Sequence, residues 1–178
     1  NISQFGGPQG GITFTAPGAV VDYNYLNPGN ATGTNTNEFS IIIYGNSASV
    51  HNNLLLIPIT ANSESRGLII SGYAANGGEN VYANYVGAFE QPDNTEYGGC
   101  EGGGTYGIQF DDNTVNTNTA SGNTVVATAY ACAAAGLRAS ASQVTTNISS
   151  GNTYIATRES GAVACVQGAW ADQGDGCA

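Results

Sequence analysis

Residues 11–25 read GITFTAPGAVVDYNY, and this stretch decides how we interpret the fold. Apolar and polar residues alternate on both sides of a break at Pro17, first over residues 12–16 and then over residues 21–25. A period of two predicts β-strands. Residues 1–11 hold four glycines and a proline. The N-terminal segment therefore has the layout of a glycine-rich lead followed by an apolar strand.

Short apolar and β-branched runs continue along the chain, with turn residues recurring about every 8 to 12 residues, a rhythm typical of a β-sandwich or barrel. One stretch, residues 129–141, is compatible with either a short helix or a strand of small residues, because Gly136 weakens a helix. We therefore predict an all-β protein with a Greek-key-like, pilin-like β-sandwich head. The predicted strands cover residues 39–44, 53–60, 68–73, 81–89, 105–110, 124–131, 142–148, 153–157 and 162–166.

The charge composition excludes several classes of partner. The 178 residues include no lysine, only three arginines and 13 acidic residues, for a net charge of -10. Binding to nucleic acid or to an anionic membrane surface requires clustered cations, so neither is expected. The longest apolar run, residues 54–59, is too short to cross a bilayer. Hydrophobic residues make up 41% of the chain, which is enough for a folded core.

Four cysteines, Cys100, Cys132, Cys165 and Cys177, lie in the second half of the chain. Their spacing does not match the paired clusters of zinc sites, so we interpret them as disulfide partners in an oxidising compartment. Three pairings are open. We favour Cys165 with Cys177, which would fix the C-terminal tail, and this leaves Cys100 with Cys132.

The chain also carries three N-glycosylation sequons, at Asn1, Asn30 and Asn147. It begins without Met and without a basic, apolar leader, which favours a mature product whose signal peptide has been removed. The expected location is extracellular, at the cell surface.

No arrangement of residues predicts catalysis, a cofactor or a metal ion. The single histidine, His51, has no nucleophile in a recognisable frame, and a turn histidine is the simpler interpretation. Acidic pairs such as Asp111 with Asp112 have no spacing that selects a glycosidase pair. Residues 172–176 resemble part of a calcium loop but lack its closing Glu, and the glycine-rich residues 98–104 lack the Lys of a phosphate loop.

In layout and composition, the whole chain resembles subunits of archaeal surface filaments of the thread and bundling-pilus kind, which assemble by donor-strand complementation. The resemblance rests on residues 11–25, on the β-rich head and on the sequons. It implies a head, residues 26–178, that lacks one strand, and an N-terminal extension, residues 1–25, that completes the head of the next subunit. The donor residues would be Ile12, Phe14, Ala16, Val20 and Val21.

The resulting expectation is a non-enzymatic, pilus-like homopolymer, glycosylated and involved in adhesion or biofilm formation. One alternative is a secreted, lectin-like β-sandwich, because ten tyrosines among many Asn and Gly residues could line a sugar groove. A further alternative is an acid-stable secreted hydrolase.

Overall fold

The computed structural model describes twelve stretches of the chain, and every regular element within them is a β-strand. These stretches are residues 12–26, 37–44, 47–58, 64–71, 78–89, 104–111, 118–129, 133–139, 148–158, 163–167, 171–173 and 176–177.

Eighteen strands form three six-stranded sheets. Sheet 1 contains β1 (Ile12–Phe14), β4 (Asn37–Ile43), β7 (Glu64–Ser71), β10 (Gly104–Asp111), β13 (Ala133–Ala139) and β16 (Val163–Gln167). Sheet 2 contains β2 (Val20–Asp22), β5 (Ser49–His51), β8 (Asn80–Tyr82), β11 (Thr119–Ser121), β14 (Ile148–Ser150) and β17 (Ala171–Gln173). Sheet 3 contains β3 (Tyr25–Leu26), β6 (Leu54–Pro58), β9 (Tyr85–Phe89), β12 (Thr124–Ala129), β15 (Thr153–Arg158) and β18 (Gly176–Cys177).

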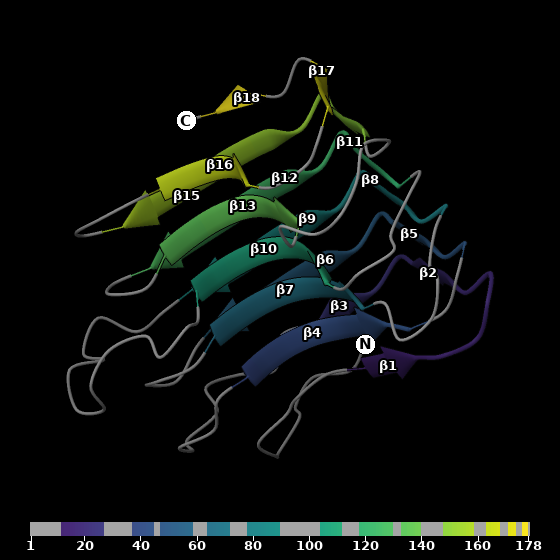
Figure 1. Cartoon of the computed structure of the whole chain (residues 1–178). Helices are drawn as coiled ribbons and strands as arrows, with labels where there is room; N and C mark the ends of the chain where they lie inside the picture. Colours follow the sequence, from purple (N-terminus) through teal and green to yellow (C-terminus); the bar gives the residue numbers. More distant parts are fainter. Residues whose placement is uncertain are drawn as a thin grey trace.

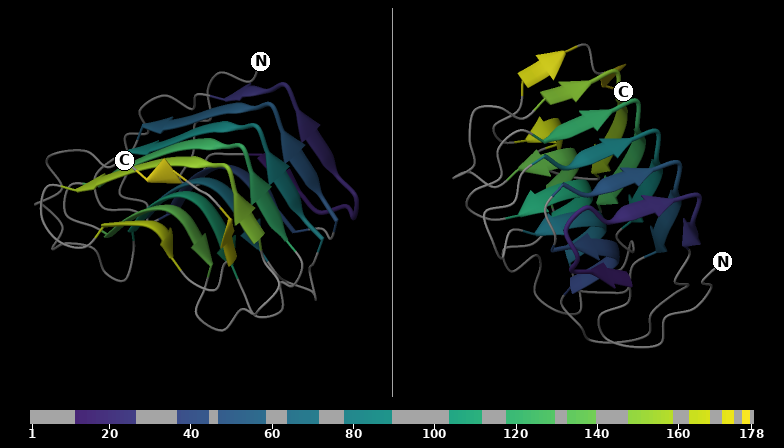
Figure 2. Two further views of the ribbon diagram at one scale, coloured as in Figure 1. Left: turned by 90° about the horizontal axis from the view of Figure 1, so that it is seen from above. Right: turned by 90° about the vertical axis from the view of Figure 1, so that its right-hand side faces the viewer.

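The strands coil into a parallel β-helix. Each strand pairs in parallel with the strand three places further along the chain, so three consecutive strands make one turn, which we call a rung. Six rungs are stacked in order, from the purple first rung to the yellow last one (Figures 1 and 2). Neighbouring rungs are about 4.8 Å apart, the usual distance between paired strands.

The all-β expectation is confirmed, but the Greek-key sandwich is not. A Greek key is built from antiparallel strands, whereas every pair between the described strands is parallel. Period-two alternation and short apolar runs bounded by turns occur in both architectures, so they located most of the strands without fixing their partners. Residues 133–139 form strand β13, which settles the ambiguous stretch as a strand of small residues.

The predicted donor residues belong to the first rung. Ile12 and Phe14 lie in β1 and pack, partly buried, against the core. Val21 is buried in β2, whereas the neighbouring Val20 is 61% exposed. Ala16 lies exposed in the corner between β1 and β2. In this structure Ile12, Phe14, Val20 and Val21 belong to strands that pair with the second rung of their own chain.

The division into an extension, residues 1–25, and a head, residues 26–178, stays a prediction. Strands β1, β2 and β3 are paired with β4, β5 and β6 and continue the same three sheets.

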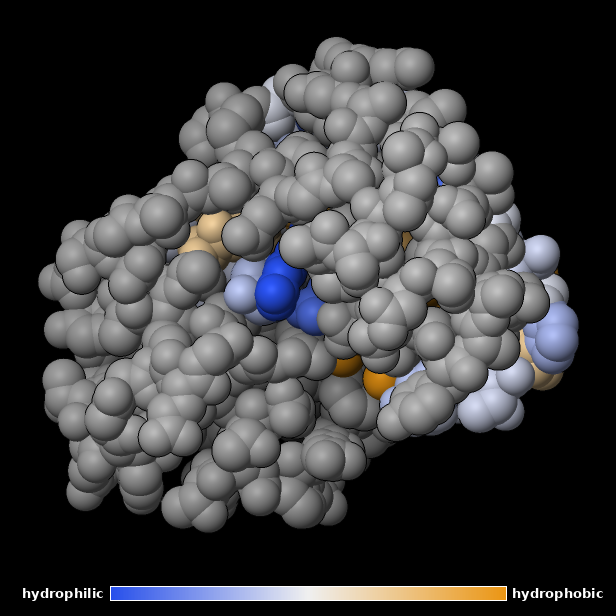
Figure 3. Space-filling view, in the orientation of Figure 1, coloured by the Kyte–Doolittle hydropathy of each residue, from blue (hydrophilic) through white to orange (hydrophobic). Residues whose placement is uncertain are grey.

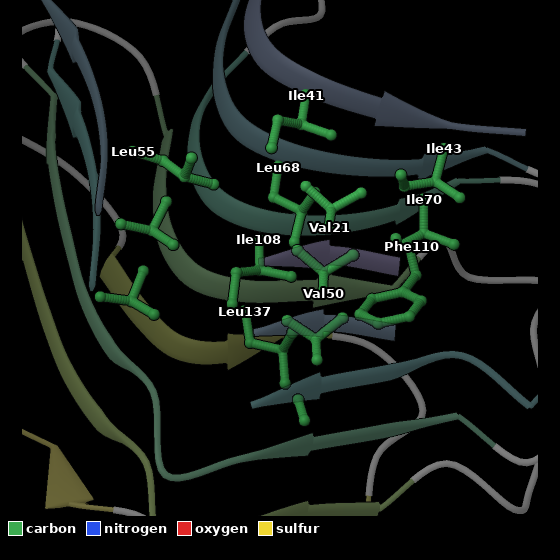
Figure 4. Packing of buried hydrophobic residues seen from close by; sticks show 14 of the residues in the cluster. Val21, Ile41, Ile43, Val50, Leu55, Leu68, Ile70, Ile108, Phe110 and Leu137 are labelled. Atoms are coloured by element: carbon green, nitrogen blue, oxygen red, sulfur yellow. The ribbon is translucent and has the colours of Figure 1, made fainter. Parts of the chain in front are cut away.

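The core consists of columns of like residues, one from each rung. Ile41, Leu68, Ile108 and Leu137 are in register in sheet 1 and are fully buried (Figure 4). Parallel in-register stacking places equivalent positions of successive rungs above one another, so one apolar position per rung produces a continuous apolar column.

Sheet 1 bends inward at glycines, where sheet 3 approaches closely. A Cβ at Gly67 would lie 2.1 Å from Val86 Cγ1, and a Cβ at Gly107 would lie 1.9 Å from Val125 Cγ1. Both distances are far below van der Waals contact, so only glycine fits at these two positions.

Candidate functional site

The corner between sheets 2 and 3 is the most regular feature of the molecule. In each of the first five rungs it consists of two residues, and the first has a positive φ. The φ values are 51° at Tyr23, 55° at Asn52, 53° at Ala83, 59° at Gly122 and 61° at Gly151. This left-handed conformation turns the chain sharply at a single residue. It is strained for residues other than glycine.

The second corner residue is an asparagine in all five rungs, and the five side chains form a hydrogen-bonded ladder. The backbone N–H of Asn53 donates to Oδ1 of Asn84 at 3.1 Å, and Nδ2 of Asn53 donates to the same oxygen at 2.9 Å. The same pair of bonds links Asn84 to Asn123 and Asn123 to Asn152. The ladder comprises Asn24, Asn53, Asn84, Asn123 and Asn152.

The chemistry of the ladder requires asparagine. Each interior Nδ2 also donates to a carbonyl in the preceding rung, as Asn84 does to the Val50 oxygen at 2.9 Å. Asn53 Nδ2 reaches the Val21 oxygen at the same distance. Asp would lack these donors, and Ser would be too short to bridge two rungs. Asn53, Asn84, Asn123 and Asn152 are at most 3% exposed, so their polar groups are satisfied inside the protein.

The ladder is open at the first rung. Asn24 donates from its backbone N–H and from Nδ2 to Oδ1 of Asn53, both at 3.0 Å. Among the described residues, no group donates to Oδ1 of Asn24, whereas Oδ1 of each other ladder asparagine accepts from the preceding rung. Asn24 is also only partly buried. The first rung therefore presents an acceptor that a further rung could use.

The corner between sheets 1 and 2 contains a buried carboxylate. Glu79 is 1% exposed, and among the described residues neither of its carboxylate oxygens has a hydrogen bond of full geometry, although the backbone N–H groups of Glu79 and Ser47 lie close enough to act on its charge. Its backbone N–H donates to Oδ1 of Asn118 in the next rung at 3.0 Å. Burial raises the pKa of Glu79 above its ordinary value of 4.5, and the backbone N–H groups of Glu79 and Ser47 lower it in part.

Aromatic rings stack outside the first three rungs. His51 and Tyr82 are in register in sheet 2, and their rings are 4.6 Å apart and nearly parallel. Tyr23 meets His51 edge to face at 6.4 Å. Asn52 Nδ2 lies 3.0 Å from Nδ1 of His51. The predicted turn histidine is thus the last residue of β5, immediately before the corner, and it is held between two aromatic rings.

All the described large apolar side chains that are exposed belong to the first three rungs. In Figure 3, a mixed group of pale and tan residues occupies the right-hand edge, where β2, β5 and β8 lie in Figure 1. The exposed residues are Val20, Tyr23, Tyr25, Leu54 and Tyr85. In rungs 4 and 5, the positions in register with Tyr25, Leu54 and Tyr85 carry Thr124 and Thr153.

Several predicted site residues lie outside the described residues, and their roles stay predictions. Cys165 lies in β16 and Cys177 in β18, so the preferred pair would join sheet 1 to sheet 3. Outside the described residues lie Cys100, Cys132 and the sequon residues Asn1, Asn30 and Asn147.

No cluster of three or more His, Cys, Asp or Glu residues in the described ranges could hold a metal ion. Within the same ranges, no helix is long and apolar enough to cross a membrane. Comparison of the chain with known protein families, with curated protein sequences and with solved structures finds no match. The geometry of the β-helix is therefore the basis for any functional inference.

Sequence reasoning missed the ladder, although the sequence contains a signal for it. Each corner follows the same pattern: a small buried residue (Val, Ala or Ser), an outward residue, a left-handed residue and an asparagine. The segments are VVDYNY at 20–25, SVHNNL at 49–54, NVYANY at 80–85, TASGNT at 119–124 and ISSGNT at 148–153. Successive asparagines are 29, 31, 39 and 29 residues apart, so a search for a fixed period would not find them.

Proposed function

We propose that this chain is a structural subunit of an extracellular filament, and that copies join head to tail by stacking the first rung of one copy on the last rung of the next. The observation that carries the proposal is that all three sheets end at edge strands at both ends of the β-helix. Strands β1, β2 and β3 form one end, and β16, β17 and β18 form the other.

The two ends match in geometry. Both consist of one strand from each sheet with the same chain direction, so a second copy could continue the parallel pairing in all three sheets. Such a contact is heterologous, because one end meets the opposite end of the next copy. Heterologous contacts that do not close into a ring produce filaments. The free Oδ1 of Asn24 adds an acceptor at the joint.

Within the described part of the chain, β2 is an edge strand with backbone groups directed away from the rest of its sheet. The Ala19 oxygen accepts from the Ser49 N–H at 2.8 Å, and the Val21 oxygen accepts from Asn53 Nδ2. Residues 19 and 21 therefore face the second rung. Because alternate residues of a strand direct their backbone groups to opposite sides, the N–H and C=O of Val20 face away from the second rung.

In this proposal, the N-terminal strands act as a pairing edge and not as an inserted strand. The two modes make different predictions for a chain that lacks residues 1–25. Insertion would be abolished, because the donor is gone. End stacking would persist, because β4, β5 and β6 would form a new edge with the same geometry.

The proline variant Val20→Pro tests the proposal. Proline at an edge strand is tolerated where its nitrogen faces outward, but it removes the donor and places a ring at the edge. In negative-stain electron microscopy, we expect the wild-type protein to form filaments. We expect the Val20→Pro variant to fold but not to polymerise. The matched control, Val20→Thr, keeps the N–H and should polymerise.

Charge sets the conditions for that experiment. A net charge of -10 opposes association between copies, and this repulsion is screened by salt and declines towards the pI of about 4.1. Polymerisation should therefore increase with salt and with moderate acidification. Wild-type protein that stays monomeric throughout this range, or Val20→Pro that polymerises as well as the wild type, would overturn the proposal.

A further inference from the structure

The described side chains on the outer face of sheet 3 are uncharged, in a chain with 13 acidic residues. Leu26, Leu55 and Val86 point into the core, so their neighbours in β3, β6 and β9 point outward. The outward positions of the described side chains in sheet 3 carry Tyr, Leu, Gly, Val, Ile, Phe and Thr, and none of these is charged.

An in-register column runs across this face, perpendicular to the strands. Tyr25, Leu54 and Tyr85 occupy it in the first three rungs, and they are 39%, 37% and 42% exposed. Thr124 and Thr153 continue the column in the next two rungs. The column thus changes from apolar to hydroxyl-bearing side chains along the axis of the helix.

Beside the column, the absence of a side chain at Gly87 leaves room for the ring of Phe89. A Cβ at Gly87 would lie 2.7 Å from Cε2 and 3.0 Å from Cζ of the Phe89 ring. The ring therefore occupies the space where a side chain at Gly87 would stand. A larger residue at position 87 would displace the ring and interrupt the face.

The area and the charge of this face together limit the class of molecule that it can bind. Three half-exposed side chains offer an apolar area on the order of 100–200 Å², well below the roughly 800 Å² per partner of a stable protein interface. The absence of charge on the face gives no attraction to a polyanion or a polycation. A narrow, neutral, extended polymer fits both limits.

The spacing of the tyrosines indicates which kind of neutral, extended polymer would fit. Tyr25 and Tyr85 occupy the same column two rungs apart, which corresponds to about 9.6 Å at the usual strand spacing. In an extended β-1,4-linked polysaccharide, successive sugars turn over, so equivalent ring faces recur every second sugar at a comparable distance. Tyrosine combines an apolar ring with a polar hydroxyl, which suits the C–H face and the hydroxyl rim of a sugar.

We propose that this face binds an uncharged, extended β-1,4-linked polysaccharide along the column. Sugar faces pack on Tyr25 and Tyr85, Leu54 fills the position between them, and Thr124 and Thr153 hydrogen-bond to sugar hydroxyls. The site lies on the outer face of sheet 3 and includes Tyr25 of the end strand β3, but all of its side chains come from one chain, so a single subunit is sufficient for binding.

The test is co-sedimentation of the full chain with microcrystalline cellulose and with chitin. The key variant replaces Tyr25, Leu54 and Tyr85 with Thr, which is the chain's own residue at this register in rungs 4 and 5. We expect binding of the wild-type protein to at least one of the two polymers and about a tenfold or greater loss in the variant. Circular dichroism and thermal unfolding should show that the variant is folded.

The control removes exposed apolar side chains from another part of the molecule. Val20→Thr combined with Tyr23→Asn changes two of the most exposed apolar residues, neither of which lies on the outer face of sheet 3, and should bind like the wild type. Absence of wild-type binding to both polymers would overturn the proposal, as would equal binding by the triple variant. Self-association that the triple variant abolishes, without polysaccharide binding, would assign the face to a second copy and also overturn it.

Discussion

Two of the connections in each rung, the corner between sheets 1 and 2 and the corner between sheets 2 and 3, differ in regularity. At the corner between sheets 2 and 3, asparagine follows a left-handed residue in each of the five described copies, and every interior Oδ1 accepts hydrogen bonds. At the corner between sheets 1 and 2, the equivalent positions hold Ala19, Ala48, Glu79 and Asn118. The Glu79 carboxylate has no hydrogen bond of full geometry to the residues that the structure describes. The corner between sheets 2 and 3 fixes the register of the rungs, whereas the corner between sheets 1 and 2 tolerates different residue types.

This difference has a physical origin. At the short corner of two residues, the backbone oxygen of each asparagine accepts from the next rung, whereas the asparagine N–H is satisfied by the side chain of the next asparagine. The other corner adjoins connections of different lengths, from five residues at 15–19 in the first rung to eight residues at 72–79 in the third. A longer connection can satisfy its backbone in more than one way, so no single residue type is required there.

At the corners, the largest effect is expected at the centre of the asparagine ladder. Asn84→Ala removes the acceptor of two bonds from Asn53 and the donors to Asn123 and to the Val50 oxygen. Buried partners are left unsatisfied, so we expect a loss of about 3 kcal/mol in the free energy of unfolding, measured by chemical denaturation.

The open end of the ladder provides the matched control. Asn24→Ala removes bonds at a partly buried position, and no described group donates to its Oδ1. We expect a loss of about 1 kcal/mol. Equal losses at Asn24 and Asn84 would show that burial within the ladder adds no stability.

The second prediction concerns the irregular corner and its dependence on pH. Because the pKa of Glu79 is raised in the folded chain, the folded state binds the proton more tightly than the unfolded state. The stability contributed by the protonated form is complete below the ordinary value of 4.5 and is lost as the pH rises through the raised pKa. Glu79→Gln keeps the shape and cannot ionise.

We therefore expect Glu79→Gln to be more stable than the wild type by about 1 kcal/mol at pH 8, and we expect this gap to close as the pH falls to 4.5. Denaturation at a series of pH values measures the gap. The difference between the two proteins isolates Glu79, because the other acidic residues are common to both. A gap that widens on acidification would contradict the assignment.

The two corners also show how far the sequence could predict the structure. Alternation located most strands, because side chains of a strand face inward and outward in turn in any sheet. It could not predict parallel pairing, since the partner of a strand lies three strands away and the connecting loops differ in length. Asn53 and Asn84, for example, are 31 residues apart, and Asn84 and Asn123 are 39 apart.

The burial of Glu79 could not be predicted from the sequence, for a related reason. It follows two glycines, Gly77 and Gly78, and such an acid is expected in a solvated loop. Its burial arises from stacking between Ala48 and Asn118 in neighbouring rungs. The asparagines were accessible in principle, because each one ends a similar segment, but recognising them required aligning short segments at unequal intervals.

The third prediction separates conformational strain from packing at the regular corner. Gly122 has a φ of 59°, and a Cβ added there would meet nothing within 4 Å. Gly122→Ala should therefore cost only the left-handed conformation, about 1 kcal/mol. Gly107→Ala is the steric counterpart, since its Cβ would overlap Val125 Cγ1, and it should cost at least about 3 kcal/mol. Similar losses for both variants would contradict this separation.

The smallest effect is expected from the reverse change in the third rung. Ala83 has a φ of 53°, close to the 59° and 61° of Gly122 and Gly151 at the same corner. Ala83→Gly relieves about 1 kcal/mol of strain in the folded chain but gives the unfolded chain more freedom, which costs about 0.4 to 1 kcal/mol. We expect a net gain of about 0.5 kcal/mol or less in the free energy of unfolding. A clear loss in the free energy of unfolding would mean that the Ala83 methyl group makes a favourable contact. The side chain at this position would then contribute to packing, and its backbone would turn the chain.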